Sequence, residues 1–105
     1  MHYLFEVTAK PGYTIEQYAE AWMRASELIQ QAPGAKGTRL HRKIGDERTA
    51  LAIATWESKA ARDASPASLP GEVQAIIESQ APFVEIRLIG EFEAPKWEVL
   101  PPNQR

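Results

Sequence analysis

The chain reads GTRLHRKIG over Gly37–Gly45 and TALAIATWES over Thr49–Ser58, and these two segments decide its fold. Their alternating residue types predict two strands folded into a hairpin, with the turn at Gly45–Arg48. One parity carries the large apolar residues Leu40, Ile44, Leu51 and Ile53. The other parity carries cations, small residues and one indole, at Arg39, His41, Lys43, Ala50, Ala52, Ala54 and Trp56. This second parity indicates a partly polar cavity rather than a solvated surface.

Two elements are predicted before the hairpin. His2–Lys10 alternates and predicts a strand, which Pro11 and Gly12 end. Thr14 is suited to cap the following helix, and Gln17, three residues later, can complete a capping box. An apolar stripe at three- and four-residue spacing continues to the Pro33-Gly34 pair, where we expect the helix to end.

After the hairpin, the sequence predicts a second helical region and a last strand. The helix is expected to begin after Ser58, to be interrupted over residues 65–71 by two prolines, and to resume near Glu72. Phe83–Glu93 alternates again and predicts the last strand, in which Phe92 shares the parity of Val84.

The order strand–helix–strand–strand–helix–strand predicts an α+β, ferredoxin-like sandwich with a four-stranded antiparallel sheet and both helices on one face. We expect this domain to span residues 1–94, with an extended tail over residues 95–105. The expected helix-side core of the sheet consists of Tyr3, Phe5, Val7, Leu40, Leu51, Ile53, Val84, Ile86 and Leu88.

The opposite sheet face is expected to carry Leu4, Trp56 and Ile89, which nothing in the chain would cover. A sheet face with large apolar groups usually packs on another sheet. The sequence therefore predicts a homodimer in which two sheets enclose a barrel. The tail from Pro95 is expected to reach the partner, with Trp97 as its anchor.

Composition excludes several classes of function. The 105 residues fit one domain, and a net charge of −2 does not favour nucleic acid or an anionic membrane as a partner. The chain has no cysteine, which rules out disulfides and a cysteine nucleophile, and its two histidines show no metal-ligand spacing. No signal peptide, membrane-spanning stretch or phosphate-binding glycine motif is found, so we expect a cytoplasmic protein without a metal.

Six residues of the polar parity form the candidate site, because all are expected to project into the barrel: Glu6, Arg39, His41, Trp56, Glu85 and Arg87. Only His41 has an ordinary pKa suited to proton transfer near neutral pH, so it is the candidate base. Trp56 offers a flat ligand a stacking surface, and Arg39 or Arg87 can hold an anion. The alternatives are that the charges pair with one another at an interface, that the histidine is structural, and that the indole plugs the barrel.

The run PGAKGTRLHRKIG at residues 33–45, followed by ATWESK at residues 54–59 and a helix, resembles the antibiotic biosynthesis monooxygenase-like family of the dimeric α+β barrel superfamily. The resemblance implies that fold and a homodimer. Its members include cofactor-independent oxygenases of aromatic polyketides or quinols, and haem-degrading enzymes. The haem-degrading branch uses an Asn on the first strand and a Trp and a His on the second helix. This chain has Glu6 in that strand and neither residue in that helix, so the haem-degrading activity does not fit.

Three functions remain open from the sequence. The first is a cofactor-independent monooxygenase, in which His41 deprotonates a small aromatic or quinol-type ligand that then supplies electrons to O2. The second is a non-catalytic ligand-binding or structural dimer. The third is an isomerase or lyase that works by proton abstraction.

Overall fold

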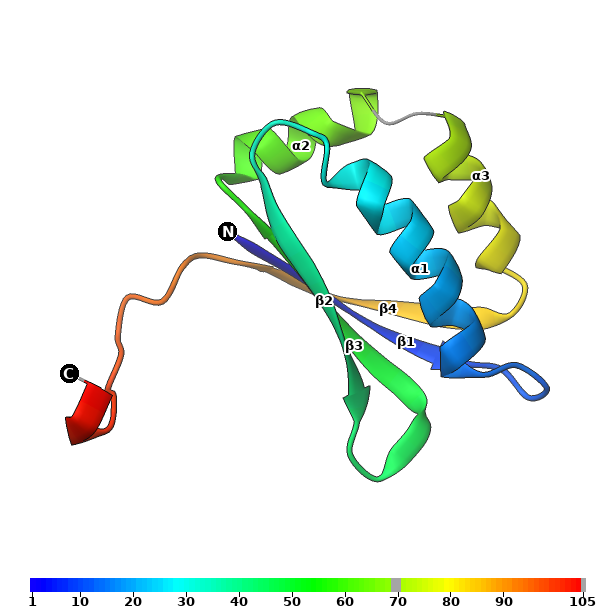
Figure 1. Ribbon diagram of the computed structural model, residues 1–105, viewed down its shortest axis with the longest axis horizontal. Helices are drawn as coiled ribbons and strands as arrows, with labels where there is room; N and C mark the ends of the chain where they lie inside the picture. Colours follow the sequence, from blue (N-terminus) through cyan, green and yellow to red (C-terminus); the bar gives the residue numbers. More distant parts are fainter. Residues whose placement is uncertain (69–70, 105) are drawn as a thin grey trace.

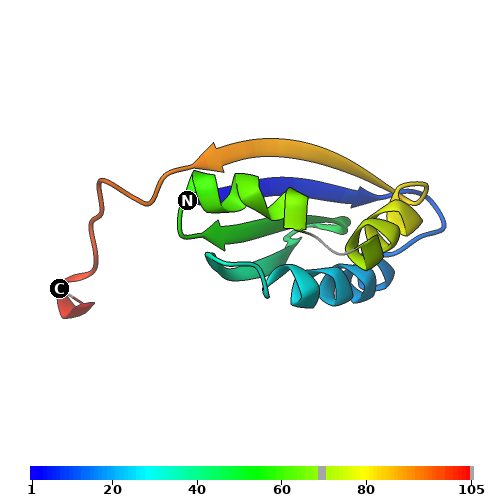
Figure 2. The same ribbon diagram turned by 90° about the horizontal axis from the view of Figure 1, so that it is seen from above.

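A computed structural model describes residues 1–68 and 71–104 of the chain. Its elements are β1 (His2–Ala9), α1 (Ile15–Ile29), β2 (Ala35–Lys43), β3 (Asp46–Trp56), α2 (Lys59–Ser68), α3 (Gly71–Gln80), β4 (Val84–Phe92) and the short 3-10 turn Pro102–Gln104. The strands form one antiparallel sheet in the order β2-β3-β1-β4, which Figure 2 shows from β4 in orange to β2 in teal. The helices lie on one side of the sheet (Figure 1), so the predicted ferredoxin-like fold is confirmed.

The predicted capping box starts α1. The Gln17 N–H donates to Thr14 Oγ1 over 3.1 Å, and the Thr14 N–H donates to Gln17 Oε1 over 3.0 Å. Both bonds satisfy amides that the first turn of a helix leaves without partners. From this start α1 buries Ile15, Tyr18, Ala21 and Ala25, the stripe that covers the sheet. None of the helices in the described part of the chain is long and apolar enough to cross a membrane.

The register of β1 and β3 determines which residues face the helices. Tyr3, Phe5 and Val7 lie opposite Ala54, Ala52 and Ala50, and Val7, Ala50 and Ala52 are almost fully buried. Each large side chain of β1 therefore has a small neighbour on β3, which leaves room for the helices to pack on the sheet.

The predicted faces of β3 are wrong. Leu51 and Ile53 lie opposite Glu6 and Leu4, on the sheet face turned away from the helices. Trp56 has the parity of the alanines and lies on the helix side, where it is 5% exposed. The reason is volume, because the aromatic residues of β1 occupy the space that larger β3 side chains would need.

Two further predictions need correction. The register of β4 shifts between Leu88 and Gly90, so Ile89 is an extra residue and Phe92 lies opposite His2, away from the helices. Helix α2 does not break at Ser65 but continues through Pro66 to Ser68, since one proline removes only one backbone donor. The rest of the expected interruption, at residues 69–70, lies outside the described residues.

Gly34, the residue before β2, provides a test of how closely α2 packs on this part of the chain. A Cβ at Gly34 would lie 2.6 Å from the Cβ of Ala61, and its φ is +86°. Gly45 has nearly the same φ, +88°, but a Cβ there would meet nothing within 4 Å. We expect Gly45→Ala to lose about 1–2 kcal/mol from its backbone conformation alone. Gly34→Ala should lose roughly 1–3 kcal/mol more because of the overlap with Ala61.

Urea unfolding of both variants measures this difference directly. Equal losses of unfolding free energy in Gly34→Ala and Gly45→Ala would show that α2 does not pack against residue 34.

Candidate functional site

The sheet separates the predicted site residues into two groups. Glu6, Arg39, His41, Glu85 and Arg87 share the face turned away from the helices, here called the open face, with Leu4, Leu51 and Ile53. Trp56 lies on the other side, beneath the helices. Within one chain, the sequence-predicted base and the sequence-predicted stacking surface are therefore on opposite sides of the sheet.

One row of the open face shows how its charges are spaced. His41, Leu51, Glu6 and Arg87 are successive partners across β2, β3, β1 and β4. Neighbouring strands lie about 4.8 Å apart, so the His41 and Glu6 backbones are about 10 Å apart, with Leu51 between them. Arg87 Nη2 and Glu6 Oε1 are 3.5 Å apart, so these two side chains pair across β4 and β1. The His41 ring makes no hydrogen bond to any residue in the described part of the chain.

The helix side of the sheet contains a cavity of about 410 Å³ between α1, α3 and the sheet. Its walls carry five aromatic side chains, at Tyr3, Phe5, Tyr18, Trp22 and Trp56. Ala21 and Ala25 of α1 and Ala54 of β3 also line it, and their small side chains leave the space open. The volume and the apolar lining are typical of a small-molecule site.

Trp56 is held in place at the end of β3. Its backbone N–H donates to the Met1 carbonyl over 2.9 Å, and its carbonyl accepts a 2.9 Å bond from the Met1 ammonium group. These bonds fix the backbone of Trp56, and its aromatic side chain lines the cavity, where aromatic rings can pack against a planar ligand. The parity that Trp56 shares with Ala50, Ala52 and Ala54 is the sequence signal for this cavity, and the structure places that parity on the helix side of the sheet and not on the open face.

Arg62 brings a cation to the cavity wall from α2. Its Cζ lies 4.4 Å from the centroid of the Tyr3 ring, close enough for a cation–π contact. Sequence reasoning did not select this residue, because nothing in the local sequence shows that α2 brings its fourth residue over β1.

Tyr18 contributes a phenol to the same wall. Every fully buried side-chain nitrogen or oxygen in the described residues has a hydrogen-bond partner. The Tyr18 hydroxyl has no partner among those residues, so open space must lie beside it. Burial raises the pKa of Tyr18 to about 12, which keeps the phenol neutral at physiological pH. The sequence places Tyr18 on the apolar stripe of α1, and only the structure shows that its hydroxyl makes no hydrogen bond within the described residues.

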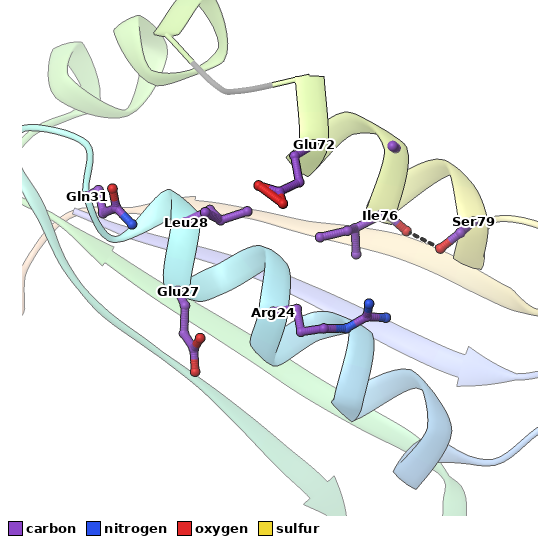
Figure 3. Close-up of a pocket in the computed structure, with 8 residues that line it drawn as sticks. Arg24, Glu27, Leu28, Gln31, Glu72, Ile76 and Ser79 are labelled. Carbon is purple, nitrogen blue, oxygen red and sulfur yellow. Dashed lines mark hydrogen bonds between the residues drawn. The ribbon is translucent and has the colours of Figure 1, made fainter.

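A second pocket, of about 550 Å³, is a surface groove between α1 and α3 (Figure 3). Arg24 and Glu27 line it from α1, and Glu72 and Ser79 from α3. Ser79 Oγ is already engaged, since it donates to the Ile76 carbonyl over 2.6 Å. The groove is larger but more open and mixes both signs of charge, so the aromatic cavity is the better candidate for a ligand site.

The raised pKa of Tyr18 makes folding stability depend on pH. The unfolded chain loses this proton near the ordinary pKa of about 10, whereas the folded chain keeps it to about pH 12. The contribution of the Tyr18 phenol to the free energy of unfolding is fully present below pH 10. It decreases as the pH rises towards 12, by about 2–3 kcal/mol in total.

Urea unfolding of wild type and Tyr18→Phe between pH 8 and pH 12 tests this dependence, because all other titrating groups are common to both proteins. We expect wild type to lose more unfolding free energy than the variant above pH 10. If the unfolding free energies of wild type and Tyr18→Phe change in parallel with pH, the Tyr18 phenol is not buried.

Comparisons with known proteins agree with this fold. Residues 1–79 match the family described as antibiotic biosynthesis monooxygenase. No curated protein matches the chain. The fold resembles SnoaB, a cofactor-independent oxygenase from Streptomyces nogalater, with 15% identity over 91% of this chain and 96% of that one and a TM-score of 0.70. It also resembles PA3566 from Pseudomonas aeruginosa, with 16% identity over 88% and 93% of the two chains and a TM-score of 0.64. The match over residues 1–79 shows that the chain belongs to the antibiotic biosynthesis monooxygenase family.

Proposed function

We propose that the protein is a cofactor-independent monooxygenase that binds a small aromatic or quinol-type ligand in the cavity between the helices and the sheet. The observation that carries this proposal is the cavity of about 410 Å³ with five aromatic residues in its walls. Membership of the antibiotic biosynthesis monooxygenase family supports the type of reaction, and SnoaB is described as an oxygenase of the cofactor-independent kind.

The proposed reaction uses O2 as the only other reactant. An anthrone-type ligand has an activated CH2 group, and its conversion follows CH2 + O2 → C=O + H2O. One oxygen atom enters the ligand, the other leaves in water, and the ligand supplies all four electrons. The protein holds the ring beside Trp56 and excludes bulk water, so that O2 meets an oriented ligand.

A pair of variants tests the location of the site with 1,8-dihydroxyanthrone as substrate and O2 consumption as the readout. Trp56→Ala should lower kcat/KM by about 10-fold or more, because stacking of a planar ring on an aromatic side chain is worth about 1–3 kcal/mol. His41→Gln should change it little, since His41 lies across the sheet from the cavity.

The hypothesis that His41 is the base makes the opposite forecast. It expects His41→Gln to lose about 10²–10⁴ of the turnover. That loss, together with an unchanged kcat/KM of Trp56→Ala, would place the chemistry on the open face instead.

The non-catalytic alternative is favoured by one observation. The described residues that line the cavity include no His, Asp or Glu, so none of them is an ordinary base near neutral pH. Binding of the anthrone to wild type without any O2 consumption would select the ligand-binding function. The same lack of a base argues against an isomerase or lyase at this cavity.

We also propose that two copies form a homodimer through their open faces. Leu4, Leu51 and Ile53 make this face apolar near its centre, and Phe92 at the end of β4 is 49% exposed. Such faces usually pack on a second sheet about 10 Å away. The paired Glu6 and Arg87 fit the interpretation of the open-face charges as interface pairs.

The C-terminal segment supports the same dimer. After Phe92 the chain runs away from the body (Figure 1), and Trp97 and Val99 are 89% and 86% exposed. The radius of gyration is 15.2 Å, against about 13 Å for a compact chain of this length. Apolar side chains on an extended arm are well suited to contact a second copy.

Sedimentation at micromolar concentration tests this assembly. Wild type should be a dimer that buries on the order of 2,000 Å². Ile53→Glu should dissociate it by placing charges in the interface, and deletion of residues 94–105 should weaken it. Met23→Glu, on the exposed side of α1, is the control and should leave it intact. A monomeric wild type would contradict the proposal.

A further inference from the structure

The charge of the cavity wall has one sign. Among the described residues that line it, Arg62 is the only one with a charged side chain. Residues 65–68 at the end of α2 and residues 69–70 before α3 contain no ionisable side chain in the sequence. A cation beside an apolar, partly desolvated space attracts an anion more strongly than it would in water.

Helix α2 determines where this cation lies. Its first turn is capped at Ser58, whose Oγ accepts a 3.1 Å bond from the Ala61 N–H, and the Arg62 N–H donates to the Ser58 carbonyl over 3.2 Å. The guanidinium group stacks on Tyr3, and the side chain is 28% exposed. Tyr3 also lines the cavity, so the cation and the ligand space share one aromatic wall.

The side-chain donors of Arg62 make no hydrogen bond to any side chain or backbone group of the described residues. The ion pair of Arg62 is a 3.8 Å contact from Nη1 to Asp63 Oδ1. Asp63 also contacts Lys59 at 3.3 Å, so its charge is shared with a second cation. A guanidinium group with open N–H donors is well suited to hold two oxygens of a carboxylate or the oxygen of a phenolate.

The Tyr18 phenol on the cavity wall favours the same kind of ligand. The Tyr18 phenol is neutral and has no partner among the described residues, so it can donate to an oxygen of the ligand. No histidine or carboxylate lines the described cavity to remove a proton from the ligand. The ligand must therefore lose its proton in solution, before it binds, or lose it in the cavity because the positive charge of Arg62 stabilises the anion.

We infer that the cavity selects a planar aromatic ligand with an anionic oxygen, and that Arg62 is the residue that binds this oxygen. This inference rests on the proposed function, because it specifies the ligand of the same cavity. The anionic oxygen belongs either to a carboxylate or to an acidic phenol or enol, and the two sources share the chemistry that Arg62 recognises.

The test compares a charged ligand with a neutral one of the same shape. Anthraquinone-2-carboxylate and anthraquinone-2-carboxamide are titrated into the protein, and quenching of tryptophan fluorescence gives each Kd. Wild type should bind the carboxylate at least about 10-fold more tightly, the range of a hydrogen bond to a charged group. Arg62→Gln should abolish this preference without changing the Kd of the carboxamide, and Arg62→Lys should retain part of it.

Arg24→Gln is the matched control. It removes the same charge from the groove between α1 and α3 and should leave both Kd values unchanged. A phenol is tested with 1,2-dihydroxyanthraquinone, whose colour reports its ionisation. Wild type should lower the apparent pKa of the bound dye, whereas Arg62→Gln should not.

Each outcome distinguishes the inference from the function on which it rests. Equal affinity of wild type for carboxylate and carboxamide, or a preference that survives in Arg62→Gln, would overturn the role of Arg62 and leave the cavity as an aromatic site. If wild type binds none of the three ligands, the cavity is not a ligand site, and the proposed function is overturned as well. The Arg62→Lys data decide the case if Arg62→Gln does not fold.

Discussion

The pairing of β1 with β3 is the constraint on which the rest of the structure depends. Tyr3, Phe5 and Val7 face the helices opposite Ala54, Ala52 and Ala50, so each large side chain has a small neighbour. A shift of one residue in β1 would turn each of its side chains to the other face, so that Tyr3 and Phe5 would leave the helix side and Glu6 would enter it. Because the register is fixed, α1 and α3 can rest on aromatic groups and leave a cavity between them and the sheet.

The same register gives the two sides of the sheet different chemistry. The helix side encloses aromatic groups with one cation and a neutral phenol, which suits a planar ligand. The open face spaces its charges along rows that also contain Leu51 and Ile53, a pattern suited to a second protein surface. The proposed ligand site and the proposed dimer interface thus lie on opposite sides of one sheet, and each of its strands contributes side chains to both.

The fold could be predicted from the sequence because its signals are local. Alternation marked the strands, the Thr14–Gln17 capping box started α1, and the order of the elements gave the topology. The faces of β3 could not be predicted, since hydrophobicity alone puts Leu51 and Ile53 in the core, whereas the volume left by Tyr3 and Phe5 accepts only alanines. The candidate site was predicted in part, because Arg62 and Tyr18 reach the cavity only through helix packing, which no local pattern reports.

Whether the ligand site lies between the helices and the sheet can be decided by a crystal structure of the protein with anthraquinone-2-carboxylate. The account predicts the ring beside Trp56, beneath α1 and α3, with the carboxylate at the guanidinium of Arg62. A ring bound on the open face beside His41, with the helix-side cavity unchanged, would contradict it.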